Sequence, residues 1–416
     1  MMKLPILHYY GTNTPGESLS PVSTIKIISV SIENLSSCTV YPHAKMDESY
    51  RIDVSSTGVS INSPEIWGTI RAFETLSQSI FWNDETNCLI FEQTIQDEPE
   101  FSHRGFMIDT ARHFLTWDVM EQFLDGMAYN KLNLIHWHMV DAQSFAYKSE
   151  VFPFLSENAA FKPEETHTYS IPDIKNFIER AKMRGIRIVP EIDSPGHMHT
   201  LCDGFSKQGY NFCTRCTGNS WDKDQMDEFF GWGPFRPDLE ENYELLETLW
   251  TELRSVFKDD IMHLGGDEVP TGCWLNDENV KKWAEENSFE NDSQIMRYHL
   301  DRLYEITKKV GFARTQVWNE AEGFESADTD EMDKRVRDPL EKPIIHSWMP
   351  WGSGYPTGFE NILDRATAEG YRLLKKIDVC SCFFFKTAFM FILMFFSLFN
   401  NLLRKTWFSL AVGIWT

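Results

Sequence analysis

Basic side chains are scarce in this chain. Its 416 residues include 39 Lys and Arg against 62 Asp and Glu, which gives a formal net charge of −23 at pH 7. Nucleic acid is bound through clustered Lys and Arg that neutralise phosphates, and the sequence shows no such cluster. We therefore expect no nucleic-acid partner. A surface this rich in carboxylates suits an acidic compartment.

A signal peptide and internal repeats are also missing. The N-terminal sequence MMKLPILHYYGTNTPGES has one Lys and a very short apolar stretch, so it makes a poor signal peptide. Either the true start lies elsewhere or the protein is cytosolic. No repeat occurs at the spacing of solenoid proteins, which excludes that class of fold.

Cysteines number only eight, and their spacing does not define a metal site. The sequence CTRC, with Cys213 and Cys216, could begin a zinc site, but no second Cys pair or His pair matches it. A disulfide in a secretory protein is the better interpretation, and the glycosylation triplets at Asn34 and Asn291 are compatible with it. We predict no cofactor and no metal.

The composition predicts a sizeable core, because 42% of the residues are hydrophobic and 14% are aromatic. The length suits one large domain and a small one. In residues 1–100, short β-like runs at 23–30 and 50–54 precede a helical pattern at 65–81. This order predicts a small α+β domain.

Residues 101–378 alternate strand-like and helix-like segments, which is typical of an α/β protein with a parallel sheet or barrel. We predict strands at 105–109, 132–139, 186–192, 261–264, 315–318 and 344–348, and the start of a seventh at Tyr371. Helices are predicted at 117–129, 172–184, 239–257, 279–287, 292–310 and 358–369. No eighth unit is visible, so a barrel here would be incomplete at its C-terminal end.

Residues 379–416 form an atypical apolar tail. The segment 382–399, CFFFKTAFMFILMFFSLF, is apolar apart from Lys386 but slightly short of the roughly 20 residues of a membrane span. One interpretation is a C-terminal membrane anchor. We favour a foreign tail from an alternative or mispredicted C-terminus, because the segment lacks turn signals and caps.

Two adjacent acids, Asp267 and Glu268, follow an apolar strand and two glycines in the sequence IMHLGGDEVP. Adjacent side chains of an extended backbone point in opposite directions, so the two carboxyl groups meet different environments. Different environments separate pKa values and allow one group to donate a proton while the other stays ionised. The plain alternative is a solvated acidic turn.

Polar residues also follow the other predicted strands, and the C-terminal ends of barrel strands converge on one site. They are Asp109, Arg112 and His113; His136, His138 and Asp141; Glu191, Asp193, His197 and His199; Trp318 and Glu320; and Trp348. His136 and His138 lie two apart on one strand and could form a zinc pair. No third ligand is specified, and histidines packed in a core are more common.

Five motifs resemble glycoside hydrolase family 20, the β-N-acetylhexosaminidases of the lysosomal type. They are HRGFMIDTARHF, NKLNLIHWHMVDAQSF, RGIRIVPEIDSPGH, HLGGDEV and VWNE. The resemblance covers about residues 50 to 375, and EIWGTIRAFETLSQ is similar to the family's non-catalytic α+β domain. It implies a (β/α)8 TIM barrel, a glycan or glycoconjugate substrate, a lysosomal or secreted location and a homodimer.

The resemblance also implies roles for residues. Glu268 would be the general acid and base, and Asp267 would hold the substrate's 2-acetamido group, which acts as the nucleophile. Asp141 and His197 would support Glu268, while Arg112 would bind sugar hydroxyls. The remaining implied roles are an acetamido pocket walled by Trp318 and Trp348, and a disulfide of Cys273 with Cys213, or alternatively with Cys216.

The sequence departs from the family pattern in three places. Ala142 replaces a usual Asp, and Glu320 follows Asn319. After Lys376 we find neither the Tyr of the seventh strand nor the Trp and acid of the eighth. We therefore expect poor stability and weak or no activity. The alternative function is an inactive truncated paralogue that retains carbohydrate binding or an interaction role.

Overall fold

The computed structural model describes residues 4–7, 23–82, 88–162, 167–215, 232–323, 342–348, 366–367, 372–377 and 410–411. Two compact units divide the chain between them. The first consists of Met1–Ser102, Gln122–Asn133 and Ala181–Arg187, and the second of His103–Glu121, Leu134–Arg180 and Ile188–Thr416.

The first unit contains two four-stranded sheets and a helix. One sheet has the order β3-β5-β4-β8, with bounds Ile28–Ile32, Gly58–Ser63, Tyr50–Ser55 and Gln93–Asp97. The other has the order β2-β1-β7-β6, with bounds Ser23–Ile25, Leu4–Leu7, Cys88–Phe91 and Phe81–Trp82. Ile52, Val54 and Ile61 alternate with outward residues and pack in one apolar cluster with Leu76 of helix α1 (Ile66–Gln78).

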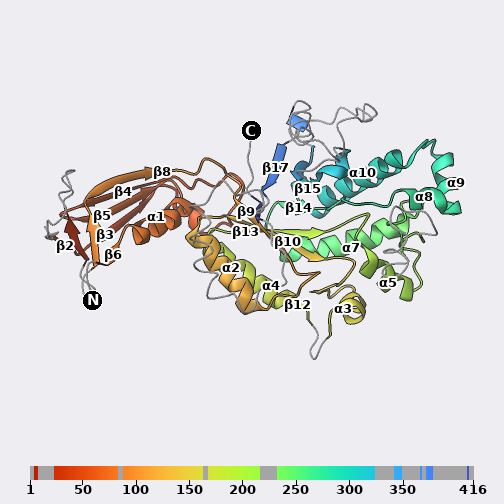
Figure 1. The fold of residues 1–416 in the computed structure, drawn as a ribbon, viewed down its shortest axis with the longest axis horizontal. Helices are drawn as coiled ribbons and strands as arrows, with labels where there is room; N and C mark the ends of the chain where they lie inside the picture. Colours follow the sequence, from red (N-terminus) through yellow and green to blue (C-terminus); the bar gives the residue numbers. More distant parts are fainter. Residues whose placement is uncertain are drawn as a thin grey trace. The chain divides into compact units, whose positions relative to one another are not determined.

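The second unit is built on a curled parallel sheet of seven strands (Figure 1), which confirms the prediction of an incomplete (β/α) barrel. The strands follow the order of the chain: β9 Gly105–Asp109, β10 Leu134–Val140, β13 Arg187–Ile192, β14 Ile261–His263, β15 Arg314–Trp318, β16 Ile344–Ser347 and β17 Arg372–Ile377. A two-residue strand, β18 (Leu410–Ala411), pairs antiparallel with β17. Each strand of the parallel set lies within a few residues of its predicted position.

Helices alternate with these strands. The long ones are α2 Trp117–Tyr129, α4 Ile171–Lys182, α7 Glu240–Val256 and α10 Asp292–Val310. Shorter elements are β11 Tyr147–Lys148, α3 Pro153–Ala159, β12 Tyr169–Ser170, α5 His199–Lys207, α8 Gly272–Asn276, α9 Glu278–Glu286 and η2 Asn319–Glu322. α10 begins where the Asn291 side chain accepts from the Gln294 amide and ends at Gly311, whose φ is 102°.

Residues in the first half of five strands form an apolar layer inside the sheet. This layer contains Leu134, Val189, Ile261, Ile344 and Leu374, all buried. Parallel strands are buried on both faces, which explains their nearly continuous apolar sequences. The layer closes the lower end of the sheet and leaves its C-terminal edge for polar residues.

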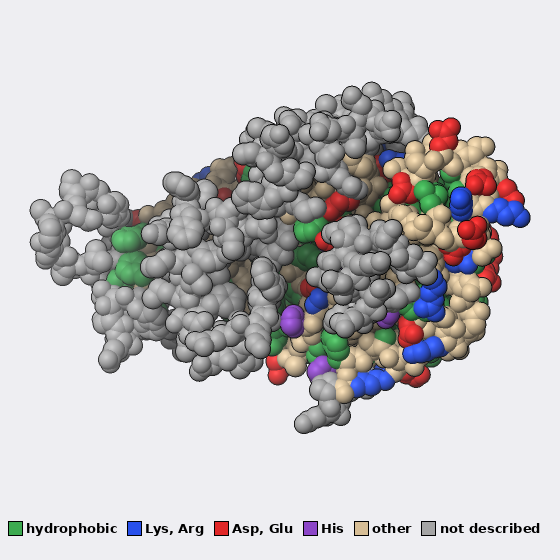
Figure 2. Space-filling model, turned by 45° about the vertical axis from the view of Figure 1, so that its right-hand side comes forward, with side chains coloured by type: hydrophobic (Ala, Val, Ile, Leu, Met, Phe, Trp, Pro, Cys, Tyr) green, Lys and Arg blue, Asp and Glu red, His purple; other side chains and the backbone are tan. Residues whose placement is uncertain are grey.

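Acidic and basic side chains are interspersed on the described surface at the right of Figure 2. Ion pairs also join α7 to α10. Arg302 lies 2.5 Å from Glu240, and Lys309 lies 2.7 Å from Glu247. These pairs join the two helices at the surface, where each contributes at most about 1 kcal/mol.

The predicted disulfide between Cys213 and Cys273 is wrong. Cys213 is bonded to Cys202 of α5, with 5.4 Å between their Cα atoms. A sulfur atom forms one such bond, and only 11 residues separate this pair in the chain. Cys273 is also disulfide-bonded, while Cys216 lies outside the described residues.

Several sequence predictions fall outside the described residues. They concern most of the helix at 358–369, Tyr371 and the apolar segment at 382–399. Within the described ranges, the structure contains no helix that is long and apolar enough to cross a membrane.

Candidate active site

The C-terminal edge of the parallel sheet gathers acidic, basic and aromatic side chains of the second unit. Asp141 follows β10 and is completely buried. His197 follows β13, and Asp267 and Glu268 follow β14. These are the four residues to which the sequence assigns catalytic roles, and they lie within one set of contacts.

Asp141, His197 and Glu268 form a chain of polar contacts. His197 Nδ1 lies 3.2 Å from Asp141 Oδ1, and His197 Nε2 lies 3.4 Å from Glu268 Oε2. His138 Nε2 contacts the other oxygen of Asp141 at 2.8 Å. The buried carboxylate of Asp141 thus orients His197, and the other ring nitrogen of His197 contacts Glu268 at the rim.

Neighbouring charges shift the pKa values of Asp141, His197 and Glu268. Burial alone would lower the pKa of His197, but the negative charge of Asp141 outweighs it and raises the pKa well above its ordinary value. The hydrogen bond from this cationic His197 lowers the pKa of Glu268. Burial alone would raise the pKa of Asp141, yet the charge of His197 and the hydrogen bond from His138 hold it well below its usual range.

The two glycines before the acid pair allow a tight turn against β13. Gly265 and Gly266 have φ of 70° and 94°, and a Cβ on Gly265 would lie 1.8 Å from Asp193 Oδ1. The Gly266 amide donates to that same oxygen at 2.8 Å. Glu268 itself has a φ of 49°, which is uncommon for a side-chain-bearing residue. The turn therefore fixes the backbone from which both acids project.

Asp193 and Asp267 form a pair of coupled carboxyl groups. Burial and then the charge of Asp267 raise the pKa of Asp193 well above its ordinary value. Burial also raises the pKa of Asp267, although the charge of His197 and a hydrogen bond from Asp193 oppose that rise. Two buried carboxyl groups with raised pKa values favour a state in which the pair holds a proton. Its side chain is 16% exposed, compared with 46% for Glu268.

Arg112 lies beside this group and is fixed by two carboxylates. Its Nη2 is 2.6 Å from Asp141 Oδ2, and its Nη1 is 2.9 Å from Asp109 Oδ2. Nε donates to Gln143 at 3.1 Å. The side chain remains 34% exposed, so a rigid guanidinium faces the opening of the site.

Glu191 of β13 is a carboxylate shared by four side chains. Its Oε2 lies 2.6 Å from His136 Nε2 and 2.8 Å from His138 Nδ1. Its Oε1 lies 3.2 Å from His263 Nδ1 and accepts from Trp318 Nε1 at 3.0 Å. Burial would raise the pKa of Glu191, but these rings lower it well below its ordinary value.

The two tryptophans proposed for the sugar pocket occupy different environments. Trp318 is buried, whereas Trp348 is partly exposed, and their rings lie 6.5 Å apart. Trp348 Nε1 donates to the Glu320 carboxylate at 2.9 Å. Both rings stand at the rim on β15 and after β16, but their contact with a sugar stays a prediction.

Sequence reasoning named Glu191 and Asp193 as strand-end residues but gave neither a role. Their importance depends on contacts from three other strands, which the local sequence does not contain. The spacing PEID does place both at the end of one buried strand, and that was the signal available.

Three groups of described side chains are close enough to hold a metal ion. Two belong to the acidic rim: Asp141, Asp193 and His197; and His197, Asp267 and Glu268. The third, His136, His263 and His346, is buried one layer deeper. The rim residues also contact one another directly, through His197.

Comparisons with known proteins agree with this geometry. A family model described as glycosyl hydrolase family 20, catalytic domain, matches residues 101–371, and one described as beta-acetyl hexosaminidase like matches residues 9–79. The beta-hexosaminidase subunit beta of Homo sapiens is 34% identical over 346 residues, 83% of this chain and 57% of the relative. The beta-hexosaminidase subunit alpha of Mus musculus is 36% identical over 68% of this chain and 51% of the relative.

The chain spans about half the length of the curated relatives it matches. Among solved structures, a Flavobacterium johnsoniae chitobiase aligns with a TM-score of 0.66 and 27% identity over 81% of this chain and 47% of that one. A Vibrio harveyi exo beta-N-acetylglucosaminidase, with 22% identity and a TM-score of 0.64, supports the fold alone. The family model covers well over half of the chain, and the chain therefore belongs to glycosyl hydrolase family 20.

Proposed function

We propose that this protein is an exo-acting β-N-acetylhexosaminidase that hydrolyses terminal non-reducing N-acetylhexosamine from glycoconjugates. Hydrolysis proceeds with retention, and the substrate's own acetamido group is the nucleophile. The observation that carries the proposal is the contact chain from Asp141 through His197 to Glu268, with the coupled Asp267 beside it.

The two acids then have separate tasks. Glu268, the more exposed, protonates the glycosidic oxygen and later activates water. Asp267 holds the acetamido nitrogen and stabilises the positive charge that develops on that group. This division needs an ionised Asp267, and the charge of His197 favours that state against the effect of burial. The assignment needs no nucleophile from the protein.

The electrostatics favour work at acidic pH. A general acid must be protonated before it donates, and His197 lowers the pKa of Glu268 in the free protein. Activity therefore falls as pH rises through this low value. The excess of acidic residues and the disulfide fit a lysosomal or secreted protein.

Arg112 binds the hydroxyls of the terminal sugar, and Trp318 and Trp348 border the acetamido pocket. The relatives are named as subunits, which supports assembly of this chain into a homodimer. A sedimentation measurement of molecular mass tests that assembly, and a purely monomeric chain would contradict it.

The test is Glu268→Gln, assayed with a chromogenic N-acetyl-β-glucosaminide. Loss of the proton donor should lower kcat by about 10²- to 10⁴-fold, the usual contribution of general acid–base catalysis. Glu244→Gln, at an exposed position of α7, is the matched control and should leave kcat unchanged. Wild-type turnover in the Glu268→Gln variant would refute the assignment. Sugar binding without turnover in the parent chain would instead support the inactive-paralogue alternative.

A further inference from the structure

A layer of histidines lies directly above the apolar layer of the sheet. Each histidine lies two residues after a member of the apolar layer: His136 after Leu134, His263 after Ile261 and His346 after Ile344. Residues two apart on a strand face the same side, so the three rings point into the sheet interior. They come from alternate strands β10, β14 and β16, the arrangement that builds one layer of a barrel.

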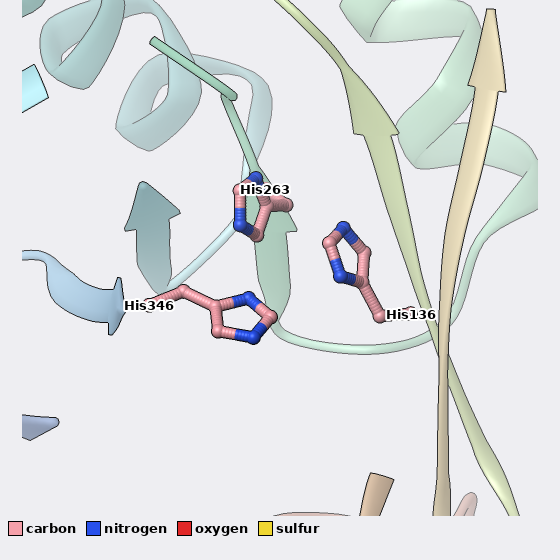
Figure 3. A group of neighbouring side chains, drawn as sticks. All are labelled: His136, His263 and His346. Carbon is pink, nitrogen blue, oxygen red and sulfur yellow. The ribbon is translucent and has the colours of Figure 1, made fainter. Parts of the chain in front are cut away.

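Bulky branched residues normally fill such a layer. Here the three rings are at most 2% exposed. Each ring offers one nitrogen, and these three atoms lie within 4.8 Å of one another. Figure 3 shows the rings gathered around a common space between the strands.

Each ring has one nitrogen without a hydrogen-bond partner among the described residues: His136 Nδ1, His263 Nε2 and His346 Nε2. Leaving a buried polar atom unpaired costs about 1–3 kcal/mol. Three such atoms in one layer are a large cost, and a cation held among the rings would lower it. Neutral imidazole nitrogens are also the donors that Zn²⁺ prefers.

The opposite nitrogens are held in the way that metal-binding histidines are held. Glu191 lies 2.6 Å from His136 Nε2 and 3.2 Å from His263 Nδ1. A carboxylate accepts from N–H, which leaves the far nitrogen of each ring as a free lone pair. In this structure the Gly265 amide donates to His263 Nδ1 at 3.1 Å, so metal binding at Nε2 requires the other tautomer of His263, in which Nδ1–H turns to Glu191.

His346 has an equivalent support. The side-chain amide of Gln316 lies 3.0 Å from His346 Nδ1, and the Gln316 oxygen has no partner among the described residues. The two ends of an amide are interchangeable in shape, so this oxygen can accept from Nδ1–H. His346 Nε2 then presents its lone pair.

We propose that His136, His263 and His346 form a buried binding site for a divalent transition metal of the zinc type, coordinated by three imidazoles. Ligand nitrogens around tetrahedral zinc are about 3.4 Å apart, since each Zn–N bond is about 2.0–2.1 Å. The nitrogens lie within 4.8 Å of one another in this structure, so the rings would move closer together when the ion binds. A water molecule completes the coordination, as in other three-histidine sites.

The site joins β10, β14 and β16, which are not neighbours in the sheet. Its task is therefore structural: the ion fixes the strands below the acidic rim. The metal takes no part in the hydrolysis, because none of its ligands is a rim residue.

The test titrates Co²⁺, a spectroscopic substitute for Zn²⁺, into the metal-free full chain. We expect one equivalent to bind with the visible absorption of a tetrahedral site. His346→Gln should weaken binding by more than the roughly 10- to 100-fold that loss of an outer-shell partner costs. The control is His299→Gln, a buried ring whose nitrogens contact Ser194 and Tyr243, and it should bind as the wild type does.

Two further measurements keep the outcome decisive. Glu268→Gln removes a rim ligand, so loss of binding in that variant with retention in His346→Gln would place the ion at the rim and overturn the proposal. If His346→Gln does not fold, X-ray absorption of the zinc-loaded wild type counts the imidazole ligands. Three support the site, and fewer overturn it, as does a wild type that binds no ion.

Discussion

At the scale of single residues, His197 controls the protonation of Glu268. Its position depends on Asp141, which is buried and ionised, and on a backbone φ of 56°. An imidazolium held in this way keeps the acid ionised in the free protein. The acid therefore needs either an acidic medium or a substrate that displaces water from it.

Replacement of His197 by Gln should move the pH profile. Gln can donate a hydrogen bond but carries no charge, so the pKa of Glu268 rises toward its ordinary value. The alkaline limb of kcat/KM reports this pKa in the free enzyme, and it should shift to higher pH. The maximal rate should fall by about 10²-fold, because the acid is less well positioned.

The measurement is a pH–rate profile of His197→Gln beside His113→Gln, a substitution of an exposed histidine. The control should keep the wild-type limb. An unchanged limb, or a shift toward lower pH, in the His197 variant would contradict the coupling described here.

Motifs alone were enough to select Asp267, Glu268, Asp141, His197 and Arg112, and the structure brings all five together. Their catalytic roles stay predictions. The raised pKa of Asp193 could not be predicted, because it depends on burial and on the approach of the segment after β14 to the end of β13 after folding. A local sequence contains the residues of such a pair but not their separation.

At the scale of elements, the turn after β14 determines the site geometry. Gly265→Ala would place a methyl group 1.8 Å from Asp193 Oδ1 on a backbone with φ of 70°. The left-handed conformation alone costs a residue with a side chain about 1–2 kcal/mol, and the clash adds to this. We expect a loss of at least about 2 kcal/mol in the free energy of unfolding.

Urea unfolding of Gly265→Ala and Gly126→Ala provides the comparison. Gly126 lies within α2, and a Cβ there would meet no atom within 4 Å. Its replacement should be neutral or stabilise by about 0.5–1 kcal/mol. Equal stability of the two variants would show that the turn tolerates a side chain.

Strand positions were predictable because apolar runs between helical patterns are distinctive, and β9 was predicted with its observed bounds. The disulfide was not. Cys202 lies on α5 and Cys213 in the segment that follows it, and only the return of the chain brings them to 5.4 Å. The predicted pairing of Cys213 with Cys273 relied on approximate positions in the family and did not take the path of the chain after α5 into account.

At the scale of the whole molecule, buried ion pairs join distant parts of the chain. In the first unit, Arg71 Nε lies 2.7 Å from Glu48, and its other nitrogens donate to the backbone oxygens of Arg184 and Gly185. Arg71 and Glu48 are 2% and 4% exposed. One guanidinium therefore holds segments that are more than 100 residues apart.

Arg71→Met should destabilise the protein by about 3–5 kcal/mol, because the buried Glu48 loses the cation that it contacts. Thermal and urea unfolding measure the loss. Arg51→Met removes a pair with Asp53 at the surface, where water screens the charges, and should cost much less than Arg71→Met. Similar losses in both variants would mean that burial adds nothing to the pair.

Glu191 has one more consequence for the molecule. It contacts His136 of the histidine layer and His138, which in turn contacts Asp141 at the rim. Against the effect of burial, the charge of Glu191 raises the pKa of His138, and the charges of the histidines around Glu191, His138 among them, lower the pKa of Glu191. The protonation of Glu191 and His138 is therefore linked, and replacement of either residue should change the pH at which the other titrates.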